Sequence, residues 1–442
     1  WKREMDRRDS IRIKYASKYD ESSNYWKNSI GVSRAIRKLH VLEKKRAMER
    51  VYVYICSINS IPNNIIIFEG ENLNLKIATG LTLASKNSKT ILTASNINKE
   101  KINSEGTNSL NLNLFGTIPV KEVNVNVIPK TMVVPLGNAI GMKLYTKGVL
   151  VVGMSQIETD KNEKKKPYEN SGIEQGDTIL EINNNIVGNT EDLIKEVENS
   201  KGNTINIKYL REDKTMQTDI TPVKSKNTYK IGLWVRDAAA GVGTLTFYEP
   251  STNLFMALGH GISDIDTEEI VNIANGELVT ANIVSITKGR KGYPGEIRGT
   301  IDEGKTIGRI YKNTNFGVYG TVKNKNYLEA DLTQEMEVAP RNEIKEGKAE
   351  IICQLENSAK KKYDIEIEKV YIDNNQNNKS MLIKITDKEL LEKTGGIIQG
   401  MSGAPIIQEG KFVGAVTNVL VNDPTQGYGV FADIMIKEMR SI

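Results

Sequence analysis

The feature that most constrains the fold of this chain is that residues 231–442 show no long helical periodicity before their end. Short stretches of alternating apolar and polar residues follow one another instead, punctuated by glycines, as in GTLTFYEP, GRIYKNTNFGVYGTV and KFVGAVTNVLV. Alternation with a period of two is typical of strands that bury one face. This spacing predicts an antiparallel β-barrel, or a pair of barrels, over residues 231–442.

The amino-terminal part of the chain divides into two regions. Residues 1–50 are polar and basic and predict an extension without a core of its own. Residues 51–130 contain alternating runs such as NLNLKIATG and VNVNVIP, which predict a small β-rich region. Its first stretch, residues 51–68, is uncharged and follows the basic block, but asparagines and a proline interrupt it. Two interpretations stay open, a buried strand and a degraded membrane anchor.

Composition excludes several functional classes. The net charge of +5 is modest for 442 residues, and much of the basic excess lies near the amino end, which argues against a nucleic-acid-binding surface. The two cysteines, Cys56 and Cys353, lie far apart without CxxC spacing, so a zinc ribbon is excluded. No cluster of metal-ligating residues is visible in the sequence, and we predict neither a metal nor a cofactor.

Residues 131–223 carry a more specific pattern. GVLVVGM and DTILEINN alternate as strands do, and Asn189 is placed to cap a helix with Leu193, Ile194 and Val197 on one face. The stretch SGIEQGDTILEINNNIV resembles the core of a PDZ domain, which implies a groove for an extended peptide.

In a PDZ domain a glycine-containing loop offers backbone N–H groups to the bound peptide. By position we expect this loop at Ile140, Gly141 and Met142, preceded by Ala139. Residues 224–230 are predicted to be a linker to the domain that follows.

The motif QGMSGAPI predicts an exposed nucleophile. Ser402 lies in a glycine-rich turn that presents its hydroxyl and directs successive backbone N–H groups toward one point, as acyl transfer requires. We expect the N–H groups of Gly400 and Ser402 to form the oxyanion hole. The turn resembles the GDSGGP turn of chymotrypsin-like peptidases, with Met401 and Ala404 replacing Asp and Gly.

A serine peptidase also needs a general base, which is usually histidine because its pKa lies near neutrality. The chain has two histidines, and His40 lies in the basic extension. His260 follows the apolar run NLFMAL and is flanked by Gly259 and Gly261, which leave room around the ring. We therefore predict that His260 is the base.

The PDZ-like module, together with GVGTLTFYEPSTNLFMALGHGISD and ITDKELLEKTGGIIQGMSGAPI, resembles the stage IV sporulation protein B (SpoIVB) peptidase family of endospore-forming Firmicutes over about residues 52–442. The resemblance implies a PDZ domain followed by a chymotrypsin-like double β-barrel, in a mainly β chain. It also implies Asp387 as the acid of the catalytic group; Asp264, Asp266 and Asp331 are the alternatives, since an acid only fifteen residues before the serine is unusual for a double barrel.

The function that this resemblance implies is that of a self-cleaving serine endopeptidase of sporulation signalling. Such a peptidase is located outside the cytoplasm, at the forespore inner membrane and in the intermembrane space, with membrane attachment through its amino-terminal region. Its expected partners are its own amino-terminal segment and a regulator of an intramembrane metalloprotease, whose cleavage leads to processing of pro-sigma-K. Two other functions stay open: a degradative protease similar to the HtrA class, in which PDZ modules follow the peptidase, and a non-catalytic PDZ scaffold.

Overall fold

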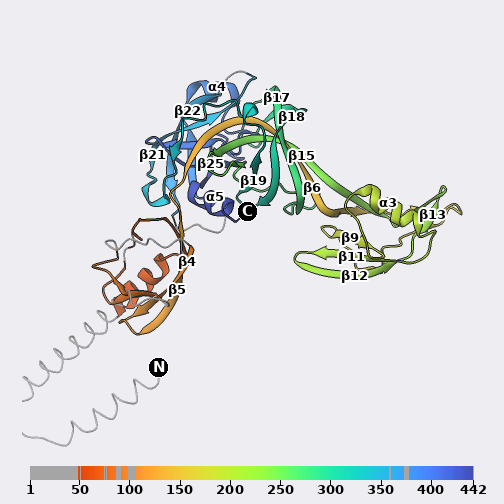
Figure 1. Cartoon of the computed structure of the whole chain (residues 1–442), viewed down its shortest axis with the longest axis horizontal. Coiled ribbons are helices and arrows are strands. Elements are labelled where there is room, and N and C mark those ends of the chain that lie inside the picture. The colour runs from red at the N-terminus through yellow and green to blue at the C-terminus, as the bar shows by residue number, and fades with distance from the viewer. Residues whose placement is uncertain are drawn as a thin grey trace, which may run out of the picture. The chain divides into compact units, whose positions relative to one another are not determined.

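The computed structural model describes residues 48–49, 51–73, 75, 77–85, 91–97, 106–357, 360–372 and 378–441. These residues form two compact units. The smaller takes in the described residues up to 63, together with those in 75–97 and 110–123, and the larger contains the rest. Figure 1 labels the main helices and strands.

In the smaller unit, residues 51–60 form a helix. Of the two interpretations that stayed open for residues 51–68, the buried strand therefore holds only for β1 (Asn64–Phe68). Val51, Tyr52 and Val53 are exposed on the helix. None of the helices in the described residues is both long and apolar enough to cross a membrane. Strand β2 (Leu81–Ser85) pairs antiparallel with β3 (Ile91–Thr93) and with residues 110–114 of β4 (Gly106–Leu114).

The larger unit contains two six-stranded barrels. In the first, pairing runs from β6 through β15, β16, β19, β18 and β17 and returns to β6, so that the sheet closes on itself. These strands are β6 (Met132–Met154), β15 (Leu233–Glu249), β16 (Leu254–Ala257), β17 (Ile273–Thr287), β18 (Glu296–Thr314) and β19 (Gly317–Val322). Its interior is filled by inward-facing apolar side chains such as Ile140, Leu144, Phe255 and Ile310.

The second barrel closes in the order β21, β22, β23, β26, β25 and β24. Its strands are β21 (Gly347–Cys353), β22 (Lys361–Val370), β23 (Met381–Ile385), β24 (Pro405–Gln408), β25 (Lys411–Val419) and β26 (Gln426–Phe431). Helix α4 (Lys388–Thr394) follows β23, and α5 (Ala432–Met439) packs against β25. Asp433 of α5 forms a buried, two-pronged ion pair with Arg341 in the 3-10 turn η2 (Arg341–Glu343). The chain is therefore mainly β with a double barrel, and the predicted fold class is confirmed.

Smaller elements complete the larger unit. Strand β1 (Asn64–Phe68) runs parallel to residues 124–128 of β5 (Ile118–Ile128). Strand β20 (Met336–Glu337) pairs with the start of β6, and the 3-10 turn η1 (Lys325–Leu328) follows β19.

The PDZ domain is inserted into the first barrel. Strands β6 and β15 extend beyond the barrel, where Met154 pairs with Leu233, and the PDZ elements lie between them in sequence (Figure 1). These elements are β7 (Ile157–Glu158), β8 (Lys164–Lys165), β9 (Thr178–Ile182), β10 (Asn185–Ile186), α3 (Thr190–Asn199), β11 (Ile205–Arg211) and β12 (Lys214–Ile220). Helix α3 begins as predicted, with the Asn189 side chain accepting a hydrogen bond from the N–H of Asp192 at 2.8 Å.

Two expected boundaries differ in the structure. Residues 132–146, which we had assigned to the PDZ domain, lie in β6, and residues 134–146 pair with β15 and β17, so this segment belongs to the first barrel. Residues 224–230, predicted as a linker, form a hairpin of β13 (Val223–Ser225) and β14 (Thr228–Lys230). Lys226 and Asn227 both have positive φ at its two-residue turn, a conformation that matches the twist of the flanking strands.

Candidate active site

A cavity of about 530 Å³ is lined by residues of both barrels. The first barrel contributes Met142 of β6, residues 239–243 of β15 and the loop that follows β16. The second contributes residues 397–400, Ser402 and the end of β25. His260 and Ser402, the two residues predicted from the sequence as base and nucleophile, both line this cavity. The fold thus brings together two side chains that lie far apart in the sequence.

His260 lies in the loop that follows the end of β16. The chain turns sharply there, since Leu258 and Gly259 both have positive φ, at 75° and 85°. The Nδ1 atom of the ring lies 2.8 Å from the carbonyl oxygen of Gly261. A proton on Nδ1 would be donated to this carbonyl, which leaves Nε2 as the free basic nitrogen. Burial of the ring lowers the pKa of His260 below its usual value of 6.5, and the Gly261 hydrogen bond opposes this in part.

The two glycines beside His260 are required by close packing. A Cβ atom on Gly259 would lie 3.1 Å from the Thr417 side chain, and one on Gly261 would lie 2.6 Å from the Thr314 carbonyl oxygen. Both positions therefore let neighbouring strands approach the loop that holds the imidazole.

Ser402 lies in a tight turn that precedes β24. The N–H of Met401 donates to the carbonyl of Ile398 at 3.1 Å, and the N–H of Ala404 donates to the carbonyl of Met401 at 2.9 Å. The Ser402 hydroxyl donates to the carbonyl of Thr417 at 2.6 Å, so that in this structure it is turned toward β25.

The backbone around Ser402 offers two N–H groups. Within the described part of the chain, the N–H groups of Gly400 and Ser402 have no hydrogen-bond acceptor, whereas their carbonyl oxygens do. Thr244 holds both of those carbonyls: its hydroxyl donates to Gly400 at 2.7 Å and its N–H donates to Ser402 at 3.3 Å. Free N–H groups on a fixed turn are what an oxyanion hole requires.

The structure does not bring Asp387 into this cavity. Asp387 is the N-cap of α4, where its carboxylate accepts the N–H of Leu390 at 2.9 Å. His260 itself makes no contact with a carboxylate among the interactions of the described residues. Asp387 as the catalytic acid therefore stays a prediction.

The alternative acids have structural partners of their own. Asp264 is buried and pairs with Arg236, and its carboxylate accepts the N–H groups of Asp266 and Thr267 in a turn. Asp266 also pairs with Arg236, at 2.7 Å. Asp331 holds a separate turn through Thr333, and these hydrogen bonds lower its pKa.

The expected PDZ loop at Ile140, Gly141 and Met142 was wrong. These residues lie within β6, paired on both sides, and the Ile140 and Met142 side chains are fully buried in the first barrel. A Cβ atom on Gly141 would lie 2.8 Å from Ile301, so the glycine serves barrel packing. The loop had been placed by its position ahead of the PDZ-like strands, and position in the sequence does not show which sheet a segment joins.

The PDZ groove lies elsewhere, between α3 and the start of β15. A cavity of about 900 Å³ is lined there by Leu193, Ile194 and Val197 of α3 and by residues 229–235. Residues 233–236 pair with β6 along one edge, while β15 meets β16 only from Leu245 onward. A free strand edge beside an apolar helix face can accept a peptide as an added strand. The segment KIGLW was the signal in the sequence that could have located this groove.

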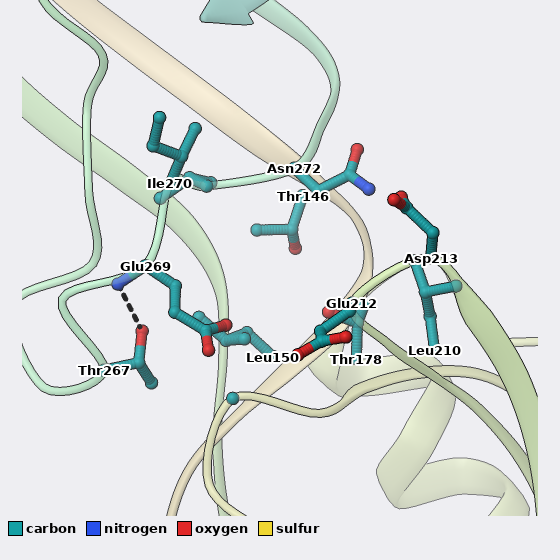
Figure 2. A pocket seen from close by; sticks show the side chains of 12 residues that line it. Thr146, Leu150, Thr178, Leu210, Glu212, Asp213, Thr267, Glu269, Ile270 and Asn272 are labelled. Atoms are coloured by element: carbon teal, nitrogen blue, oxygen red, sulfur yellow. Dashed lines mark hydrogen bonds between the residues drawn. The ribbon is translucent and has the colours of Figure 1, made fainter. Parts of the chain in front are cut away.

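A smaller pocket of about 240 Å³ lies where β6 passes from the barrel to the PDZ domain. Figure 2 shows the carboxylates of Glu212, Asp213 and Glu269 among its lining side chains. Among the described residues no group of acidic, histidine or cysteine side chains is arranged to hold a metal ion. The two cysteines are free, Cys56 exposed and Cys353 buried, and burial raises the pKa of Cys353 to about 12.

The two barrels, with a histidine and a serine in one cavity, define a chymotrypsin-like serine peptidase. Residues 227–436 match the family described as SpoIVB peptidase S55, and residues 140–221 match the PDZ domain family. These two parts of the chain are therefore similar to a SpoIVB-like, PDZ-containing serine peptidase. The first residues of the PDZ match, 140–146, lie in the barrel part of β6.

Two solved structures are similar to parts of the chain. The PDZ domain of the SdrC-like protein from Listeria monocytogenes is 27% identical, with a TM-score of 0.17, over 20% of this chain and 87% of that one. The active form of the Rv3671c protease from M. tuberculosis is 14% identical, with a TM-score of 0.28, over 46% of this chain and 74% of that one.

The amino-terminal segment is similar to a different family. Residues 1–58 match Peptidase S46. Dipeptidyl-peptidase 7 of Porphyromonas endodontalis is 51% identical over 61 residues, or 14% of this chain, and that of Porphyromonas gingivalis is 54% identical over 52 residues, or 12%. The chain spans only 8% and 7% of the length of these two relatives. Residues 1–47, with His40, lie outside the described residues.

Proposed function

We propose that Ser402 is the nucleophile and His260 the general base of a serine endopeptidase. The observation that carries this proposal is that both side chains line one cavity between two barrels. The Ser402 hydroxyl turns from Thr417 toward His260 and attacks the scissile carbonyl, while Nε2 of His260 takes its proton and later gives it to the leaving amine.

The negative charge that develops on the scissile oxygen needs donors. We propose that the N–H groups of Gly400 and Ser402 supply them, since both lack acceptors within the described residues. Thr244 holds the carbonyl oxygens of Gly400 and Ser402, which lie in the peptide units that follow the two donors, and so restricts the turn that carries them. Asp387 is proposed as the acid of this group on the resemblance alone.

We further propose that the natural role of the enzyme is sporulation signalling. In this proposal the peptidase acts outside the cytoplasm, at the forespore inner membrane and in the intermembrane space, and cleaves both itself and a regulator of an intramembrane metalloprotease. The match to the SpoIVB peptidase family and the inserted PDZ domain support it. The PDZ groove would recruit the regulator or the amino-terminal segment of another copy.

The catalytic proposal is tested with Ser402→Ala and a fluorophosphonate probe. We expect the wild-type chain to label at Ser402, and Ser402→Ala to lose labelling and about 10⁴-fold or more of its peptidase activity. Ser402→Thr and an unchanged melting temperature control for folding. Retention of self-cleavage by purified Ser402→Ala would show that another residue is the nucleophile.

The signalling proposal is tested in sporulating cells that depend on this chain. We expect Ser402→Ala cells to accumulate the intact regulator and unprocessed pro-sigma-K, while other sporulation proteins keep their normal turnover. A purified enzyme that degrades unfolded casein to small peptides, with no defect in pro-sigma-K processing, would support the degradative alternative instead.

A further inference from the structure

The cavity lined by His260 and Ser402 is almost free of ionisable side chains among the described residues. Apart from His260, none of the described residues that line it carries an ionisable side chain. The polar groups that remain are hydroxyls and amides, from residues such as Ser263, Gln399 and Asn418. A charged substrate side chain that entered would lose its water and find no opposite charge.

Apolar residues line much of this cavity. Ile397 and Ile398, which precede Ser402 in the sequence, are largely buried and also line the cavity. Pro294 and Val419 are partly exposed, and Val421 keeps 49% of its surface exposed at the rim. These surfaces can bury an apolar side chain without a change in the fold.

The walls are fixed by backbone hydrogen bonds between three loops. The N–H of Ile397 donates to Pro424 at 2.7 Å, and the N–H of Gln399 donates to Gly295 at 3.1 Å. The N–H of Gly292 donates to Val421 at 2.8 Å, which ties the rim to the loop before β18. The apolar cavity is therefore formed before a substrate arrives, and its selectivity does not depend on an induced closure.

We infer that this cavity selects peptides with an uncharged, apolar residue on the acyl side of the scissile bond, and that Val421 is a specificity-determining residue. The inference rests on the proposed function, since it assumes attack by Ser402. With the Gly400 N–H as the proposed donor to the scissile carbonyl, we expect the side chain of the residue that provides this carbonyl to lie next to Ile397–Gly400, which line the cavity.

The test compares peptides that differ only at that residue: leucine, methionine, lysine and glutamate. We expect kcat/KM of the wild-type chain for leucine and methionine to exceed that for lysine and glutamate by at least about ten-fold. Val421→Asp should raise the ratio of lysine to leucine cleavage by about ten-fold or more, because the new carboxylate can pair with lysine at the rim. Val284→Asp, at an exposed valine of β17 outside the cavity, should leave the ratio unchanged.

Two outcomes would overturn the inference. One is equal cleavage of the leucine, lysine and glutamate peptides by the wild-type chain. This measurement does not depend on whether a variant folds. The other is an unchanged lysine-to-leucine ratio in a Val421→Asp chain that labels with the fluorophosphonate probe at the wild-type rate. Failure of the proposed function differs from both, since the wild-type chain would then neither label at Ser402 nor cleave any of the four peptides.

Discussion

At the scale of single residues, the environment of the proposed base His260 leads to a prediction for the pH range of activity. Burial lowers its pKa, so the imidazole stays neutral, and able to accept a proton, at pH values where an exposed histidine is already charged. We expect the acid limb of the kcat/KM profile to have its midpoint below the usual 6.5. A midpoint above that value would contradict a buried base.

The same shift affects stability. The unfolded chain binds a proton at His260 near the ordinary pKa, whereas the folded chain resists it, so the free energy of unfolding falls as pH decreases below about 6.5. His260→Gln, which cannot titrate, should remove this part of the pH dependence in urea melts between pH 5 and 8.

Gly403 beside the nucleophile is a second position with a residue-scale prediction. Its φ is 96°, and an added Cβ would lie 2.4 Å from the Thr244 carbonyl oxygen, which is backbone that cannot move aside. We expect Gly403→Ala to lower the free energy of unfolding by about 2 kcal/mol or more, from strain and overlap together. Gly410→Ala is the matched control.

Gly410 also has a positive φ, 78°, but an added Cβ would meet open space. Gly410→Ala should therefore cost only the backbone term of about 1 kcal/mol. Equal melting temperatures of the two variants would show that the close approach to Thr244 does not constrain the turn.

At the scale of elements, α4 separates two roles for Asp387. As an N-cap, Asp387 can be replaced by asparagine at little cost, whereas alanine removes the acceptor for the Leu390 N–H. We expect Asp387→Ala to lose about 1 kcal/mol of stability in denaturant melts, and Asp387→Asn to remain close to wild type. A smaller loss for alanine than for asparagine would contradict the cap.

Activity of the same pair tests the catalytic prediction. A capping role predicts near wild-type kcat/KM for Asp387→Asn. A triad acid predicts a loss of about 10⁴-fold in that variant without any loss of stability, because asparagine holds the histidine in the wrong tautomer. Helix α4 ends at Thr394, shortly before the segment that carries Ser402. Loss of the Asp387 cap can therefore also lower activity by displacing Ser402.

The sequence predicted the positions of the strands better than the domain to which each strand belongs or the role of each residue. The alternating runs located the barrel strands, and the glycines around His260 and Ser402 marked the site because close packing leaves no room for a Cβ. Residues 132–146 were misassigned since a period of two says which side chains are buried, not which sheet buries them. The Asp387 cap was visible as an aspartate three residues before Leu390, but the resemblance assigned it another role.

At the scale of the whole molecule, strand β15 lines both the PDZ groove and the cavity that contains Ser402. Residues 233–235 of β15 line the PDZ groove, and residues 239–243 line the cavity of Ser402. We expect Ile194→Lys, which places a charge on the exposed groove face of α3, to reduce cleavage of a protein target by about ten-fold or more. Cleavage of a short peptide should be unchanged.

Ile186→Lys is the control for this prediction. Ile186 is an exposed isoleucine of the PDZ domain on β10 that does not line the groove, so its substitution should affect neither substrate. Equal losses on protein and peptide in Ile194→Lys would mean that the groove influences the chemistry and does not only recruit.

The insertion of the PDZ domain also sets the order in which the molecule can assemble during synthesis. Residues 132–146 leave the ribosome about a hundred residues before their first barrel partner, since Gly141 pairs with Val242 and then with Val279. This largely apolar segment therefore has no barrel strand to pair with while the PDZ domain is synthesised. Once folded, that domain holds residue 154 beside residue 233 and removes most of the loop-closure entropy of the first barrel pairing. We therefore expect the folded PDZ domain to bring the two barrel strands together and to favour assembly of the peptidase domain that surrounds it.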